Sequence, residues 1–183
     1  MTMIKIMIYG LTAMLGLFSS LVLAEGDAYQ IEAIIFSQAM PNTEVFDQTA
    51  SQIKWPSDLT ELSAYKKPEN TTLDDSYAAL SKDSTYQPIL HVAWVQPVGE
   101  AGLSAPVHIQ SIKSRLNGYI QMQHVQGLQM TVDLELTSNP GDNSGESLVY
   151  RLNEKRPIKL NEVYYFDHPK FGVVVKITAL SPL

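Results

Sequence analysis

Every second residue from Leu128 to Leu136 is apolar, and a polar residue fills each position between them. A β-strand places successive side chains on opposite faces of a sheet, so this alternation predicts a strand with one buried and one polar face. Similar segments flank it and are separated by turn-forming residues: Pro106–Ile112, Leu116–Val125 and Ser147–Asn153. We therefore expect antiparallel strands joined by tight turns, with a solvent loop over 138–145, where Ser, Asn, Pro and Gly are dense.

Two further segments are apolar on both alternate sets of positions. Tyr29–Gln38 begins with alternation and becomes continuously apolar over Ala33–Phe36, and Ile89–Gln96 lies between two prolines. Continuous apolar runs are typical of strands covered on both faces, so both segments are predicted to lie near a sheet centre. In the tail, 162–178, two more extended segments are expected around Asp167-His168-Pro169.

Helical patterns are few. Leu73, Tyr77 and Leu80 are spaced by four and three residues, which predicts a helix over about 73–81 with Thr72 as its N-cap. A second short helix is predicted over Asp58–Lys67, inside a polar stretch that runs from 39 to 72. These elements indicate a single α+β domain with a mainly antiparallel β-sheet and one or two short helices.

The first residues have the layout of a secretory signal. Lys5 precedes an apolar run over 6–23, and Val22-Leu23-Ala24 supplies the small or medium residues that a signal peptidase requires. We expect cleavage after Ala24, which divides the chain into a signal peptide, 1–24, and an exported domain, 25–183. The alternative is an uncleaved membrane anchor, since the run is almost long enough to span a bilayer. The expected location is the periplasm, and membrane contact is expected through this segment alone, if it is not cleaved.

Charge and cysteine content exclude several classes of function. The chain carries 13 basic and 19 acidic residues, for a formal charge of −6, which argues against nucleic-acid binding. It has no cysteine, and therefore no disulfide, no thiolate zinc site and no cysteine to carry a lipid. The four histidines lack metal-ligand spacing, so we expect no metal and no cofactor.

Two sequence patterns raise the alternative of an enzyme. Ser63-Ala64-Tyr65-Lys66 matches the Ser-x-x-Lys signature of penicillin-recognising serine enzymes, but the accompanying Lys-Thr-Gly element is absent from the sequence. Asp167 and His168 could form the acid–base pair of a hydrolase, although adjacent strand residues point to opposite faces. We expect both patterns to be structural and the protein not to be an enzyme.

Aromatic and basic side chains are the better candidates for binding. Exposed aromatic rings can stack on sugar rings, and exposure is most expected at Trp55 or among the tail aromatics Tyr164, Tyr165 and Phe166. Arg151, Lys155, Arg156 and Lys159 face a single Glu154 in sequence, which makes 151–159 the only basic cluster. The candidate contacts for a ligand or partner are Trp55, Arg151, Lys155, Arg156, Tyr164, Asp167 and His168.

Several segments together resemble the CsiV family of periplasmic peptidoglycan-binding proteins. The resemblance rests on three long motifs, in the family's order, and on the strand Gly118-Tyr119-Ile120-Gln121-Met122. The three motifs span residues 29–37, 86–97 and 164–178. The chain departs from the family pattern at Lys155-Arg156-Pro157, where paired arginines are common, at Tyr164-Tyr165, where His-Tyr is common, and in the strand after Val125, which lacks the usual Tyr-Leu-His character.

This resemblance implies a role without catalysis. It implies that the protein binds peptidoglycan and supports a class A penicillin-binding protein through the outer-membrane lipoprotein that activates this synthase. The alternatives are an enzyme that modifies peptidoglycan and an envelope adaptor that binds only proteins. The residues themselves point to an exported binding domain, and peptidoglycan enters through the resemblance.

Overall fold

The fold was obtained as a computed structural model, which describes residues 28–39, 43–98, 102–139 and 147–180. The predicted signal, its cleavage point and most of the loop over 138–145 lie outside the described residues. Within those residues, no helix is long and apolar enough to cross a membrane.

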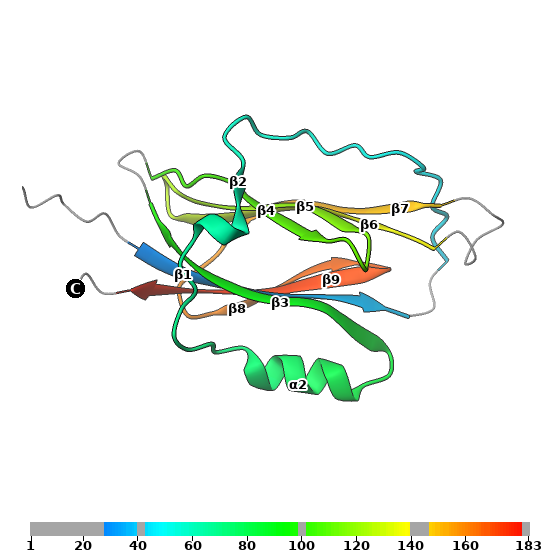
Figure 1. The fold of residues 1–183 in the computed structure, drawn as a ribbon, viewed down its shortest axis with the longest axis horizontal. Helices are drawn as coiled ribbons and strands as arrows, with labels where there is room; N and C mark the ends of the chain where they lie inside the picture. Colours follow the sequence, from blue (N-terminus) through cyan, green and yellow to red (C-terminus); the bar gives the residue numbers. More distant parts are fainter. Residues whose placement is uncertain (1–27, 40–42, 99–101, 140–146, 181–183) are drawn as a thin grey trace, which may run out of the picture.

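The described strands form two sheets that stack face to face (Figure 1). The four-stranded sheet has the order β3-β1-β9-β8 and the five-stranded sheet the order β2-β4-β5-β6-β7. The strands of the first sheet are β1 (Ala28–Gln38), β3 (Tyr86–Pro97), β8 (Val163–His168) and β9 (Phe171–Leu180). Those of the second are β2 (Thr60–Glu61), β4 (Val107–Ser111), β5 (Leu116–His124), β6 (Leu128–Thr137) and β7 (Val149–Pro157).

The predicted α+β class is confirmed, with two sheets in place of the single sheet expected from sequence. All strand pairs are antiparallel except the short β2–β4 pair. The one α-helix of the described residues, α2 (Asp74–Lys82), lies against the outer face of the four-stranded sheet beside β3 (Figure 1). The fold therefore has three layers, a helix and two sheets.

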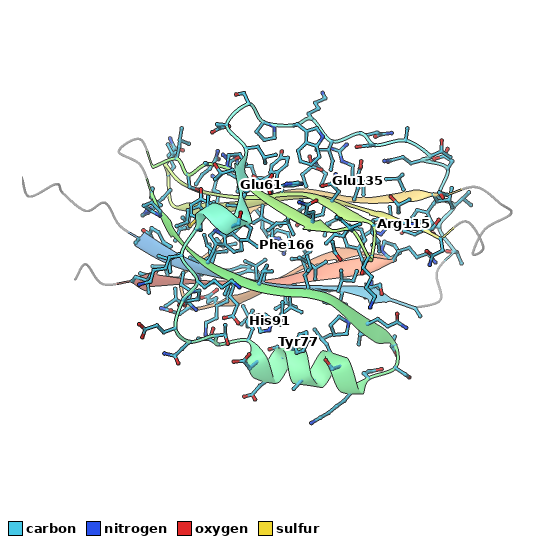
Figure 2. All side chains as sticks on the ribbon, viewed as in Figure 1. Glu61, Tyr77, His91, Arg115, Glu135 and Phe166 are labelled. Atoms are coloured by element: carbon cyan, nitrogen blue, oxygen red, sulfur yellow. The ribbon has the colours of Figure 1, made fainter. Side chains whose placement is uncertain are left out.

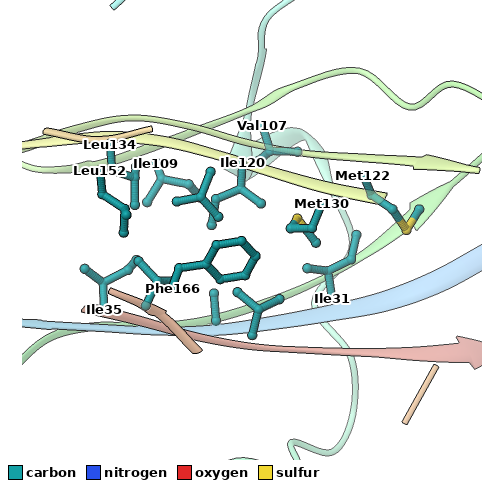
Figure 3. Packing of buried hydrophobic residues seen from close by; sticks show 14 of the residues in the cluster. Ile31, Ile35, Val107, Ile109, Ile120, Met122, Met130, Leu134, Leu152 and Phe166 are labelled. Atoms are coloured by element: carbon teal, nitrogen blue, oxygen red, sulfur yellow. The ribbon is translucent and has the colours of Figure 1, made fainter. Parts of the chain in front are cut away.

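The core lies between the two sheets, and the alternation in the sequence accounts for it. The apolar residues of β6 point inward and are buried, whereas the polar residues between them point to the outer face of the five-stranded sheet. Phe166 of β8 is fully buried near the middle of this core, among side chains from both sheets (Figure 3). A smaller apolar cluster of Ile34, Phe36 and Leu73 joins α2 to the other face of β1.

The two strands with continuous apolar runs have different positions in the sheet. β1 is central, as predicted, and pairs with β3 on one side and with β9 on the other. β3 is an edge strand, so the prediction of a second central strand was wrong. Its apolar side chains are explained by cover on both faces, since Trp94 points into the core and α2 packs on the outer face.

The helix is confirmed, but its N-terminus is capped differently from the prediction. α2 begins at Asp74 and has no side-chain cap of its own. The carboxylate of Glu32, on β1, accepts hydrogen bonds from the backbone N–H groups of Thr72 (2.8 Å) and Leu73 (3.0 Å). It also accepts one from the Thr72 hydroxyl at 3.0 Å and lies 2.8 Å from Nε2 of His91. A buried acid on the sheet thus anchors the start of the helix.

The second predicted helix, over Asp58–Lys67, was wrong. This segment forms β2 and a single 3₁₀ turn, η1 (Leu62–Ala64), and then continues in extended conformation at Tyr65. Its backbone bonds to distant strands, because Thr60 N–H donates to the Pro106 carbonyl and Lys66 O accepts from Val95 N–H. Tertiary pairing has overridden a weak local helical preference.

Candidate functional site

The outer face of the five-stranded sheet is crossed by residues 43–59, which we call the strap (Figure 1). Glu135 of β6 holds the strap through its carboxylate, which accepts hydrogen bonds from Gln52 N–H (2.7 Å) and from the Gln48 amide (3.2 Å). Gln48 is bonded in turn through its carbonyl to Val149 N–H on β7. Glu135 is consequently buried, although it lies on the polar face (Figure 2).

A partly buried ion pair lies next to this anchor on the same face. The Arg151 guanidinium donates two hydrogen bonds to the Asp133 carboxylate, from Nε and from an Nη, each at 2.9 Å. The hydrogen bond to Asp133 raises the pKa of Arg151. Burial, followed by the charge of Asp133, raises the pKa of Tyr119, the neighbour of Asp133 across β5 and β6. The pair fixes the positions of the side chains around it.

Trp55 is carried by the strap and lies at the edge of this arrangement. Its ring contacts His108 edge-on, with 5.6 Å between ring centres, and Tyr119 at 6.4 Å. Even so, 44% of the residue is exposed. An indole held by two other rings and open to solvent is a rigid, largely apolar platform that loses little conformational entropy on binding.

Apart from Lys155, a further set of side chains on this face carries polar, uncharged groups. By the strand register they share the face with Tyr119: Gln110, Asn117, Gln121, Gln123, Thr131 and Asn153. Amides and hydroxyls both donate and accept hydrogen bonds, which matches the many hydroxyl and amide groups of a carbohydrate. The outer face therefore combines an aromatic platform with a field of neutral hydrogen-bonding groups.

A groove of about 680 Å³ adjoins this face at His108 and Gln110. It runs between β3 and β4, beside η1, and its apolar lining includes Leu62, Tyr65 and Val92. Glu61 and His91 also line it, and Figure 2 shows Glu61 beside the five-stranded sheet and His91 on the side of α2. The His108 imidazole lies 2.8 Å from the Glu61 carboxylate and 2.8 Å from the Asn117 amide oxygen.

The structure brings three of the candidate residues to the same face and separates the others. Trp55, Arg151 and Lys155 share the outer face, where Lys155 donates to the Gln123 amide oxygen at 2.9 Å. Arg156 lies on the opposite side of β7, because successive strand residues alternate. Its guanidinium donates to the Tyr165 carbonyl (2.6 Å) and lies 4.2 Å from the centre of the Phe166 ring.

The basic segment is thus not one surface. Arg151 is paired with Asp133, Arg156 donates to Glu154 at 3.0 Å, and Lys159 lies 3.7 Å from Glu162. Three of its four cations therefore have acidic partners within reach.

The candidates on β8 also form no common site. The Tyr164 hydroxyl donates to Glu162 (2.8 Å) and accepts from Lys159 N–H (2.9 Å). Asp167 accepts from the Tyr165 hydroxyl at 2.6 Å, whereas His168 packs against the rings of Phe46 and Phe171. The expectation that neighbouring residues point apart is confirmed for Asp167 and His168. His168 Nδ1 accepts from Lys170 N–H, so its role is a turn contact.

Burial lowers the pKa of His168 below that of an ordinary histidine, while Glu44 and Asp167 oppose the shift. The unfolded chain therefore binds the proton more readily than the folded one as the pH falls below about 6.5. We expect the contribution of His168 to stability to be complete above that pH and to decline as the pH drops toward the lower folded-state pKa. Urea unfolding at about pH 7.5 and pH 5.5 measures this decline. The decline should shrink in His168→Asn; an equal decline in the variant would contradict the prediction.

The Ser-x-x-Lys pattern does not form one helical turn. η1 ends at Ala64, and Tyr65 is extended, with φ −101° and ψ 148°. Lys66 then pairs with the edge of β3, and Ser63 lines the groove. Among the described residues, no group of three or more His, Cys, Asp or Glu side chains could hold a metal ion.

Three residues that matter most to the outer face were missed by the sequence analysis: Tyr119, Asp133 and Glu135. Their strands were predicted correctly, but a polar residue on an alternating strand is normally assumed to be solvated. The available signal was the acidic pair at alternate positions of one strand, close in sequence to Arg151 on the next predicted strand.

The fold and this face define a binding domain, in which two stacked sheets present an anchored tryptophan over a polar sheet face. The model of the CsiV family, described as peptidoglycan-binding protein, matches residues 57–180, and the chain belongs to this family. No curated protein and no solved structure matches the chain. The matched region includes β2 through β9, while β1 and most of the strap lie before it.

Proposed function

We propose that this protein is a periplasmic peptidoglycan-binding accessory factor that supports cell-wall synthesis without catalysing a reaction. Membership of a peptidoglycan-binding family supports the ligand. The finer role follows the resemblance described above: the protein acts on a class A penicillin-binding protein through its outer-membrane lipoprotein activator. Binding would stabilise one state of that complex, which is sufficient for activation.

The glycan strand binds on the outer face of the five-stranded sheet. The observation that carries this proposal is the exposed ring of Trp55, held against His108 and Tyr119 above the polar face. A sugar ring stacks its C–H face on an aromatic ring while its hydroxyl and acetamido groups bond to neighbouring amides. Gln121 and Gln123 of β5 lie along this face and provide such groups.

Trp55→Ala is expected to weaken binding to purified peptidoglycan sacculi by roughly tenfold or more, the loss typical of a central tryptophan contact. Co-sedimentation of residues 25–183 with sacculi over a range of concentrations measures the change. Trp55→Phe should retain part of the affinity, because a smaller ring keeps some of the stacking surface.

Tyr165→Ala is the matched control. Tyr165 is 42% exposed, close to the exposure of Trp55, but it lies on β8 in the other sheet. It should leave binding within about twofold of the parent, since surface residues outside a contact contribute little. Equal losses in both variants would assign binding to some other surface.

The partner role and the location have separate tests. We expect the immobilised protein to capture the purified lipoprotein activator. We also expect the synthase to polymerise peptidoglycan faster when this protein and the activator are both present. Recovery in the periplasmic fraction with Glu25 as the first residue would support export and cleavage.

Two outcomes would favour the alternative functions. Binding to the activator without binding to sacculi would favour the protein-only adaptor. Covalent labelling by a fluorescent β-lactam, lost in Ser63→Ala, would favour the serine enzyme.

A further inference from the structure

β3 forms one edge of the four-stranded sheet, and its outer side is only partly paired. Val95 N–H donates to the Lys66 carbonyl at 2.8 Å, so the extended residues 65–66 act as a short neighbouring strand at that point. The chain then leaves the edge toward Asn70, whose carbonyl accepts from the Gln30 amide. On the N-terminal side of Val95, from His91 to Ala93, the edge of β3 faces the groove where a neighbouring strand would otherwise lie.

The register shows which backbone groups face the groove. In an antiparallel strand, the N–H and C=O groups of alternate residues point to the same side. The backbone N–H of Val95 points away from β1, because it donates to Lys66. The backbone N–H and C=O groups of Ala93 and His91 therefore point away from β1 as well. Both residues line the groove, and within the described part of the chain their backbone N–H groups have no hydrogen-bond partner.

These groups have the spacing that an extended peptide requires. A peptide strand pairs with alternate residues of an edge, while side-chain pockets hold its substituents. Leu62, Tyr65 and Val92 provide an apolar lining beside Ala93, and the 680 Å³ volume exceeds what a few waters occupy. The groove therefore suits a short extended peptide better than a sugar, which has no repeating backbone donors and acceptors.

The groove is continuous with the outer face. His108 lines the groove and also contacts the ring of Trp55. Peptidoglycan consists of glycan strands that bear short peptide stems, so a sugar stacked on Trp55 would direct its stem past His108. Lys67, also in the lining, offers a cation to the carboxylates of that stem.

We propose that this groove binds the peptide stem of peptidoglycan as an added strand on β3, paired with the backbone of His91 and Ala93. This inference rests on the proposed function, because the stem reaches the groove from a glycan bound at Trp55. The protein then binds the glycan and its peptide stem at the same time. Its affinity for peptidoglycan therefore depends on how many of the stems remain uncleaved.

The experiment compares two soluble ligands that differ only in the stem, the peptidoglycan disaccharide with its peptide and the same disaccharide without it. Binding to the purified protein is followed by quenching of tryptophan fluorescence. We expect the disaccharide–peptide to bind roughly tenfold more tightly, equivalent to about 1.4 kcal/mol. Ala93→Pro should abolish that difference, because proline removes the N–H that faces the groove and is tolerated on an edge strand. Ala93→Ser keeps the N–H and should retain the difference.

Each remaining outcome is decisive. Equal affinity of the parent protein for both ligands would overturn the stem site and leave the glycan site standing. Failure of the parent protein to bind either ligand would overturn both the stem site and the proposed peptidoglycan-binding function. An equal loss for both ligands in Ala93→Pro, or no loss for either, would show that β3 does not pair with the stem.

Discussion

Replacing Glu32 by leucine is expected to lower the free energy of unfolding by about 3–5 kcal/mol, which is a large part of the stability of a domain this size. Glu32 is 1% exposed, and its carboxylate accepts hydrogen bonds from Thr72 and Leu73 and lies beside His91. A leucine of similar size accepts none of these bonds. The buried Leu73 N–H would lose its partner, and a buried donor without a partner is costly; the donors of Thr72, which is exposed, and of His91, which is partly buried, would have to bond to water instead.

Urea unfolding followed by circular dichroism at 222 nm, a standard helix wavelength, measures this loss. Glu69→Leu is the matched control, because Glu69 is an exposed acid on the same connection to α2 and should change stability by no more than about 0.5 kcal/mol. A loss below about 1 kcal/mol for Glu32→Leu would mean that the helix is held mainly by its apolar contacts. Such a result would also remove the reason for a buried acid on β1.

Phe166→Ala is expected to cost about 3–5 kcal/mol. The ring is fully buried between the sheets and contributes to the core from β8, the edge strand opposite β3 in the four-stranded sheet. Its removal leaves a cavity and takes away the ring over which the Arg156 guanidinium lies at 4.2 Å. The two sheets should separate more easily at the side where β7 and β8 approach each other.

Thermal and urea unfolding quantify this change, with Val163→Ala as the control on the same strand. Val163 is 56% exposed, and its truncation should cost no more than about 0.5 kcal/mol. Similar losses in the two variants would contradict a core centred on Phe166.

The strands other than β2 could be predicted because each of them carries its own local pattern. Leu128–Leu136 alternates, and that alternation is sufficient to assign both its structure and its buried face. The division into two sheets could not be predicted, because it depends on which distant strands pair. Ala28 lies opposite Leu180, and no local pattern encodes that partnership. The edge position of β3 was missed for a related reason, since cover by α2 produces the same apolar pattern as a central position.

The site was predicted in part. Trp55 was identified from its residue type and its polar surroundings, and the structure places it on the same face as Arg151, in contact with His108 and Tyr119. The basic segment was predicted as a unit, but strand alternation divides Arg151 and Lys155 from Arg156. Asp133 and Glu135 were overlooked because their burial comes from Arg151 and the strap, which are contacts between segments and not properties of β6.

The pairing of β1 with β9 sets the order of events when a new chain folds. β1 lies near the start of the described chain, yet its full partner on one side is its last strand, β9. During translation β1 is synthesised well before β9. The four-stranded sheet therefore cannot be completed until β9 has left the ribosome. Pairing between strands so distant in sequence is also slow, because a long loop must close first. Until β9 is available, β1 can pair only with β3, and the four-stranded sheet lacks the strand that joins β1 to β8.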